Sequence, residues 1–270
     1  VFFKGCPLSC VWGHNPEGIS FEPSISFALD RCAPTECGGY VCLNVCPSNA
    51  LKINDEKNII EMNHAACIRC DKCFDLCTPN ALEPVGQWWS MKELLASVLI
   101  DKKFFKSTGG GVTLSGGEAT MQMDFLYHFL IELKKEEINI GLETCGMFDL
   151  AKFEKYILPY LDFIYFDLKL LHPHKSRRYT GCSNADILRN YLYLNDHCKI
   201  PVVTRIPLIP DITATKSNLA GMAHFLQKHG IAACSLLPYN PLWYDKAIKN
   251  GIQIKYSHRG HMSQKSENNC

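Results

Sequence analysis

The residues with the clearest chemistry in this chain are its cysteines. The sequence of 270 residues contains fifteen of them, and ten lie before residue 78. The segment CIRCDKCFDLCTP has the spacing C-x2-C-x2-C-x3-C and is followed by Pro79. In proteins with two [4Fe–4S] clusters, such a run gives its first three cysteines to one cluster and the fourth to the other. The run therefore predicts iron–sulfur ligation by Cys67, Cys70, Cys73 and Cys77.

A second run, CAPTECGGYVCLNVCP, has looser spacing but keeps the C-x3-C-P ending. Similar phrases, PSNAL and TPNAL, follow the two runs, as expected for a duplicated half-domain. The alternative is a pair of zinc ribbons, but zinc sites usually pair two C-x2-C knuckles over a longer gap. We therefore expect two [4Fe–4S] clusters with crossed ligands. The predicted sets are Cys32, Cys37, Cys42 and Cys77 for one cluster, and Cys67, Cys70, Cys73 and Cys46 for the other.

The opening segment CPLSCVWGHN contains an incomplete run. Cys6 and Cys10 have the spacing C-x3-C, and Gly13 stands where a third cysteine would complete C-x3-C-x2-C. Taken alone, two cysteines four residues apart are equally typical of packed core thiols. The unspaced cysteines later in the chain are expected to be small core residues. These are Cys145, Cys182, Cys198 and Cys234.

Composition excludes several classes of protein. With 28 Lys and Arg against 27 Asp and Glu, the net charge is +1, which gives no electrostatic basis for nucleic-acid binding. No run of about 18 apolar residues is present, so no membrane span is expected. An odd number of cysteines without a secretory signal favours reduced thiols, and hence a cytoplasmic location.

Outside residues 20–86, strand and helix patterns alternate along the chain. Apolar, β-branched strands joined by helices predict a parallel sheet, because parallel strands need crossover helices. The segments VFFKG, GVTLSG, INIGLETCG, LDFIYFDLK, PVVTRIPLIP and AACSLLPY are the predicted strands. Helices are predicted at 90–105 from a Ser90 cap, and near 124–137, 150–158, 185–197 and 216–229. The basic segment HKSRRY, residues 174–179, is expected to be a solvated loop.

Polar residues and glycines recur at the carboxyl ends of the predicted strands. They fall at 115–118, 143–146 and 167–169 and at Arg205. In barrels of parallel strands this end holds the active site. Each piece also has a plain structural interpretation: strand-end glycines form turns, and Asp167 and Lys169 could be a simple ion pair on one strand face.

The segment FFKGCPLSCVWGHNPEG resembles, nearly residue for residue, the opening of the radical SAM enzymes that activate glycyl radical enzymes. The resemblance covers essentially the whole chain, through TLSGGEATMQ, LETCG, FDLK, TRIPLIPD and LLPYN. In that family three cysteines hold a [4Fe–4S] cluster, and its fourth iron chelates S-adenosylmethionine. The family has a cysteine at the position of Gly13, usually Pro at Ala119 and often His at Asn240.

The resemblance implies roles for the strand-end residues. Cys6, Cys10 and Lys169 would be the catalytic residues. The amino group of the methionyl part would contact residues 116–118. Its carboxylate would contact Asp167 and Lys169, and the adenine would lie near Trp12 and His14. The full set at the S-adenosylmethionine site would be Trp12, Gly13, His14, Gly116, Gly117, Glu118, Glu143, Thr144, Asp167, Lys169, Arg205 and Asn240.

The resemblance also implies the architecture. We expect a partial (β/α)6 barrel of the TIM type at 1–19 and 87–270, with a ferredoxin-like insert for two [4Fe–4S] clusters at 20–86. Both ends look truncated, because Val1 begins inside a strand pattern and Ser263 caps an apparent helix start. We expect up to three clusters and a monomeric state. The expected partner is a glycyl radical enzyme, and the expected electron donor is flavodoxin or ferredoxin.

In this family a reduced cluster cleaves S-adenosylmethionine, and the resulting radical abstracts hydrogen from a glycine of the partner. Gly13 cannot ligate iron, so we expect a labile cluster, a [2Fe–2S] or [3Fe–4S] remnant, and weak or absent cleavage. The alternative hypothesis is a non-catalytic iron–sulfur protein that transfers electrons or docks the partner. A third hypothesis is a radical SAM enzyme that acts on a small molecule or on another peptide.

Overall fold

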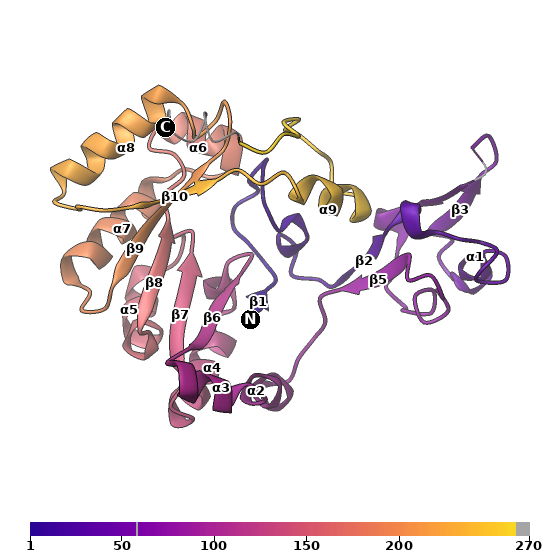
Figure 1. Cartoon of the computed structure of the whole chain (residues 1–270), viewed down its shortest axis with the longest axis horizontal. Coiled ribbons are helices and arrows are strands. Elements are labelled where there is room, and N and C mark those ends of the chain that lie inside the picture. Colours follow the sequence, from indigo (N-terminus) through magenta and orange to yellow (C-terminus); the bar gives the residue numbers. More distant parts are fainter. Residues whose placement is uncertain (58, 263–270) are drawn as a thin grey trace.

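The computed structural model describes residues 1–57 and 59–262 (Figure 1). Its main feature is a six-stranded sheet in the order β1-β6-β7-β8-β9-β10, in which every neighbouring pair is parallel. Each strand thus lies beside the next one along the chain, which confirms the predicted parallel sheet. The strands are β1 (Phe2–Phe3), β6 (Gly111–Gly116), β7 (Asn139–Thr144), β8 (Phe163–Asp167), β9 (Val202–Leu208) and β10 (Ser235–Pro238).

Helices connect these strands close to the predicted positions. The predicted helix 90–105 is two helices, because the chain turns at Asp101, whose N–H donates to the carbonyl of Val98. Ser90 caps the first of them in a reciprocal box with Glu93. The helices are α2 (Met91–Leu99), α3 (Lys102–Thr108), α4 (Met123–Lys135), α5 (Leu150–Tyr156), α6 (Pro173–Thr180), α7 (Ala185–His197), α8 (Lys216–Lys228) and α9 (Trp243–Lys249). The predicted helix start at Ser263 lies outside the described residues.

The two faces of the sheet differ, because successive side chains of a strand point to opposite sides. Leu142 and Phe166 are fully buried in the core that the sheet forms with α4, α5, α7 and α8. Glu143 and Asp167, the next residue on each strand, point to the other face. The apolar alternation therefore positions the polar strand-end residues on the face that the helices leave open.

The prediction of a solvated loop at residues 174–179 is wrong, because this segment lies in α6. Pro173 occupies the first turn and Gly181, at φ +84°, ends the helix in the left-handed conformation. Ser176 and Thr180 are buried and share hydrogen bonds with the carbonyl of Cys182. Pro173 and Gly181 are thus the sequence signals for the two ends of this basic helix.

Residues 24–85 form a small unit with its own core. It contains two antiparallel pairs, β2 (Ser24–Phe27) with β5 (Leu82–Val85) and β3 (Leu51–Asn54) with β4 (Ile59–Met62), and the short helix α1 (Val41–Val45). Figure 1 shows this unit to one side of the six-stranded sheet, with α9 between them. Its core combines Ile25, Leu51, Ile60 and Leu82 with several cysteines.

Among the described helices, none combines the length and the apolar character needed to span a lipid bilayer.

Candidate active site

A hollow of about 210 Å³ lies at the carboxyl ends of the parallel strands, facing the segment we call the cysteine loop, residues 4–19. Most of the residues predicted for the site line it. Those at the hollow are Cys6, Cys10, Trp12, Gly13, His14, Gly116, Gly117, Glu143, Thr144, Asp167, Lys169 and Arg205. The structure does not bring Glu118 or Asn240 to this lining.

Backbone hydrogen bonds hold the cysteine loop in place. The N–H groups of Gly5 and Cys6 donate to Gly18 and Ile19 within the loop, at 2.8 and 3.1 Å. Those of Ser9 and Val11 donate to carbonyls of α6, at 2.8 and 3.0 Å. The helix that was expected to be a loop therefore positions the two cysteines of the opening run.

The glycines of the GGE segment allow the loop to approach the sheet. A Cβ on Gly117 would strike the carbonyl oxygens of Gly5 and Gly18. Gly116 has φ +119°, and a Cβ there would strike the backbone of Phe3. Both positions need glycine for close backbone contact, whether or not a ligand also contacts them.

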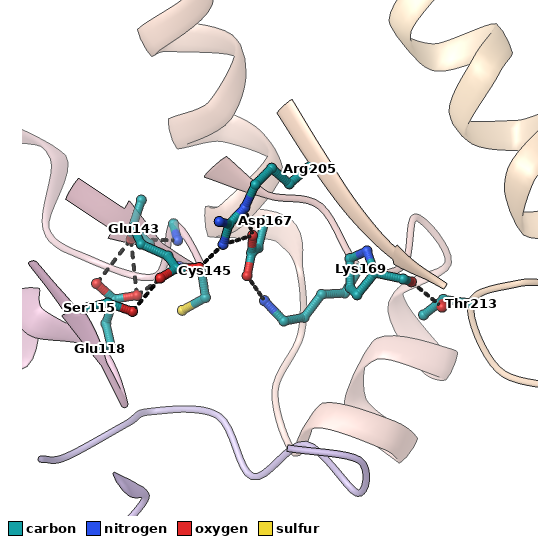
Figure 2. Close-up of polar contacts among 11 residues, drawn as sticks. Ser115, Glu118, Glu143, Cys145, Asp167, Lys169, Arg205 and Thr213 are labelled. Carbon is teal, nitrogen blue, oxygen red and sulfur yellow. Dashed lines mark hydrogen bonds and ion pairs between the residues drawn. The ribbon is translucent and has the colours of Figure 1, made fainter. Parts of the chain in front are cut away.

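One network of charges crosses the floor of the hollow (Figure 2). Arg205 Nε donates to Asp167 Oδ1 at 2.9 Å, and the same guanidinium pairs with Glu143. Lys169 Nζ lies 3.3 Å from the other oxygen of Asp167. Ser115 donates to Glu143, so the network contains two cations and two carboxylates drawn from neighbouring strands. The plain ion pair of Asp167 and Lys169 exists, but it is part of this larger network.

The network is only partly open to solvent. Relative exposures of the side chains are 15% for Arg205, 16% for Lys169 and 20% for Asp167. Burial lowers the pKa of Lys169, but the charges of Asp167, Cys10 and Cys145 together outweigh it, and the pKa lies above the ordinary value. The pKa of Arg205 is lowered by burial. Lys169 therefore stays a cation in the hollow.

Glu118 has turned away from the hollow into the protein and is 1% exposed. Its carboxylate accepts hydrogen bonds from the hydroxyls of Thr120 and Thr144, at 2.8 and 2.9 Å, and from the N–H of Cys145 at 2.7 Å. This buried carboxylate ties the end of β6 to the end of β7. Its predicted contact with a methionyl amino group stays a prediction.

The thiols at the hollow have unequal environments. Burial raises the pKa of Cys10 to about 12. A hydrogen bond with the thiol of Cys145 lowers the pKa of Cys6 and raises that of Cys145. Cys145 was expected to be a small core residue; it is 7% exposed and also lines the hollow. Its position directly after Thr144 at a strand end was the signal that could have found it.

Gly13 has one close backbone neighbour on the side where a Cβ would lie. A Cβ built on it would meet, within 4 Å, only the carbonyl oxygen of Cys10 at 3.3 Å. The opening run therefore presents two thiols and space for a third side chain. A three-thiolate ligand set does not fit the residues of this run as they stand.

The cysteines of residues 32–77 gather around two smaller hollows. Each hollow is lined by three cysteines of one run and the last cysteine of the other. The first has Cys32, Cys37, Cys42 and Cys77, and the second has Cys46, Cys67, Cys70 and Cys73. Within the described part of the chain, no group of three or more His, Cys, Asp or Glu is spaced to hold a single metal ion.

The two runs also end in the same local geometry. The sulfur of Cys46 accepts the N–H of Ala50 at 3.3 Å, and the sulfur of Cys77 accepts that of Ala81 at 3.2 Å. Asn49 and Asn80, in the phrases shared by the runs, both have positive φ, at 51° and 53°. Burial raises the pKa of Cys42 and of Cys73 to about 11. The repeated sequence phrases thus correspond to a repeated backbone structure.

Three residues fall outside what the sequence indicated. Asn240 is exposed and its Oδ1 accepts the N–H of Leu242 at 3.0 Å, so it shapes a turn. Cys234 is exposed, and its assignment to the core is wrong. Tyr165, which had no predicted role, lies under the guanidinium of Arg205, with 4.9 Å from Cζ to the ring centre.

The sequence is similar to those of several known proteins. The family described as the Radical SAM superfamily matches residues 70–220. The chain is 36% identical to the trans-4-hydroxy-L-proline dehydratase activating enzyme of Clostridioides difficile, over 92% of this chain and 82% of that protein. It is 31% identical to the indoleacetate decarboxylase activating enzyme of Tractidigestivibacter scatoligenes, over 93% and 80%. It is 32% identical to the isethionate sulfite-lyase activating enzyme of Nitratidesulfovibrio vulgaris, over 91% and 80%.

Proposed function

Because the chain belongs to the radical SAM superfamily, among its activating enzymes, we propose that it activates a glycyl radical enzyme. The reaction is reductive cleavage of S-adenosylmethionine, followed by hydrogen abstraction from a glycine of the partner. The observation that carries the proposal is the hollow in which Cys6, Cys10, Lys169 and Arg205 converge at the strand ends. The relatives serve a dehydratase, a decarboxylase and a lyase, so their names do not select one partner.

The residues of the hollow fit the amino-acid part of S-adenosylmethionine, which carries both a carboxylate and an ammonium group. Lys169 and Arg205 supply cations for the carboxylate, and Glu143 and Asp167 supply acceptors for the amino group. Trp12, at 3% exposure, forms an apolar wall and excludes water from one side. These groups bind and orient the substrate; Cys6 and Cys10 would contact the cluster.

The [4Fe–4S] cluster that the family uses at this hollow does not fit the opening run of this chain. The cluster supplies one electron to the sulfonium when three thiolates hold it. Here the run offers Cys6 and Cys10, and Gly13 has no donor atom. We therefore assign an impaired reaction to this chain and assign the defect to Gly13.

The insert at 20–86 would supply two further [4Fe–4S] clusters. The crossed sets of four thiols around the two small hollows support it, because they match the ligand exchange of two-cluster proteins. These clusters would receive electrons from a flavodoxin or ferredoxin. The barrel, residues 1–19 and 87–270, would then act as a monomer on its partner.

The test compares the parent chain with Gly13→Cys, and with Gly13→Ser as the matched control that adds a side chain without a thiol. Each is reconstituted with iron and sulfide anaerobically and reduced with dithionite, and 5′-deoxyadenosine released from S-adenosylmethionine is measured. We expect many-fold greater release from Gly13→Cys alone. Equal release from all three chains would contradict the assignment of the defect to Gly13.

A second candidate is a non-catalytic iron–sulfur protein that transfers electrons or docks the partner. The observation in its favour is the combination of two four-thiol hollows with an incomplete opening run. It predicts that Gly13→Cys, fully loaded with iron, releases no 5′-deoxyadenosine, while the clusters of the insert still accept electrons from reduced flavodoxin.

A further inference from the structure

The thiol that Gly13 cannot provide has another source at the same hollow. At Gly13 itself, no side chain of the described residues other than its neighbours Trp12 and His14 can lie within 4 Å of where a Cβ would be. His14, the neighbouring residue, is exposed. No third thiol of the cysteine loop therefore stands at the place of the missing ligand, and a substitute thiolate has to come from another segment.

Cys145 is the candidate because it is buried and still lines the hollow. It directly follows β7 and is 7% exposed. Its thiol lines the same hollow as the thiols of Cys6 and Cys10. In Figure 2 its sulfur points away from the ion-pair network of Glu143, Arg205 and Asp167.

The backbone fixes Cys145 in this position. Its N–H donates to the buried carboxylate of Glu118 at 2.7 Å. The next residue, Gly146, has φ +80°, and a Cβ there would strike the ring of Phe166. With its backbone held on both sides, Cys145 is fixed at the hollow that Cys6 and Cys10 also line.

No other thiol of the described chain lines this hollow. Cys182 donates from Sγ to the carbonyl of Pro7 at 3.2 Å, behind the cysteine loop. Cys198 follows α7 and packs against the main core. The hollow is therefore lined by three thiols, two from the loop and one from β7.

We propose that Cys145 supplies the third thiolate of an iron–sulfur cluster that is also held by Cys6 and Cys10. The inference rests on the proposed function, in which this hollow is the cluster site. Thiolates are the ligands that iron–sulfur clusters use, and each of the three thiols releases its proton when it binds iron. Cys6, Cys10 and Cys145 would hold such a cluster, which would supply the electron for cleavage of S-adenosylmethionine.

The test counts iron and sulfide in the reconstituted parent, Cys145→Ser, Cys198→Ser as the matched thiol control, and the double variant Gly13→Cys/Cys145→Ser. We expect about twelve irons per parent chain and about eight in Cys145→Ser, because one [4Fe–4S] cluster is lost. Cys198→Ser and the double variant keep about twelve. Addition of S-adenosylmethionine changes the EPR spectrum of every reduced chain except Cys145→Ser.

Three outcomes would overturn the assignment: a parent with only about eight irons, an unchanged iron count in Cys145→Ser, or the same loss in the double variant. The last would show that the serine disturbs the fold and not a ligand. If His14→Ala loses the cluster and Cys145→Ser keeps it, the third ligand is His14 and the assignment to Cys145 is wrong. These iron counts do not depend on 5′-deoxyadenosine release by Gly13→Cys, which tests the proposed function separately.

Discussion

Asp167 and Arg205 lie directly opposite each other on β8 and β9, and Arg205 Nε donates to Asp167 Oδ1 at 2.9 Å. Glu143 on β7 pairs with the same guanidinium. One cation therefore links the ends of three parallel strands at the floor of the hollow. Because the three side chains are 15–30% exposed, solvent screens their charges only in part.

Replacement of Arg205 by Met keeps the apolar stem and removes the charge. We expect it to lower the free energy of unfolding by about 2 kcal/mol, because hydrogen bonds to two carboxylates are lost. Arg189→Met is the control, since its pair with Asp186 is exposed, at 64% and 53%, and worth less than about 0.5 kcal/mol. Urea unfolding followed by circular dichroism checks this. Equal losses in the two variants would mean that the network does not hold the strand ends.

The buried carboxylate of Glu118 gives a second prediction. In Glu118→Gln one acceptor oxygen becomes an N–H₂ donor, so Cys145 N–H or a threonine hydroxyl loses its partner. We expect a loss of about 1–3 kcal/mol in the free energy of unfolding. Glu132→Gln, at an exposed pair with Lys135, is the control and should change it little. A Glu118→Gln chain as stable as its parent would contradict the role assigned to this carboxylate.

Three glycines with different surroundings give a third prediction. Gly146→Ala should cost about 2–4 kcal/mol in unfolding free energy, because φ is +80° and the new Cβ meets Phe166. Gly221→Ala, inside α8, meets only Leu171 at 3.7 Å and should stabilise the chain by about 0.5–1 kcal/mol. Gly13→Ala should lie within about 0.5 kcal/mol of the parent. Strong destabilisation by Gly13→Ala would show that position 13 cannot accept the family's cysteine.

The crossed ligand sets of the insert can be tested by pairs of substitutions. Cys77→Ser and Cys46→Ser should each remove about four irons, and together about eight. Cys77→Ser combined with Cys32→Ser should remove no more iron than either alone, because both line one hollow. If Cys77→Ser combined with Cys67→Ser removes only about four irons, each run holds its own cluster and the crossed arrangement is wrong.

The alternation of apolar residues was sufficient to predict the sheet and most helices. Ile140 and Leu142 face the core and Glu143 does not, so the pattern also predicted which strand-end residues share a face. The bridge from Arg205 to Glu143 and Asp167 could not be predicted, because it depends on the register between strands. The sequence of each strand carries little information about that register.

Other features depended on contacts between distant segments. The inward turn of Glu118 requires the hydroxyl of Thr144 on the next strand. The contact of Cys145 with Cys6 joins the end of β7 to the cysteine loop, and nothing in the spacing of these two cysteines indicates it. Helix α6 could have been predicted from Pro173 and Gly181, but its hydrogen bonds to the cysteine loop could not.

The central claim is that S-adenosylmethionine binds in this hollow, on a cluster to which Gly13 supplies no ligand. It is tested most directly by pulsed EPR on the reduced Gly13→Cys chain, with S-adenosylmethionine labelled with ¹⁵N in its amino group or ¹⁷O in its carboxylate. We predict hyperfine coupling of both labels to the cluster, and weaker coupling in Lys169→Met, which lacks one cation for the carboxylate. A fully loaded Gly13→Cys chain without coupling to either label would contradict the account.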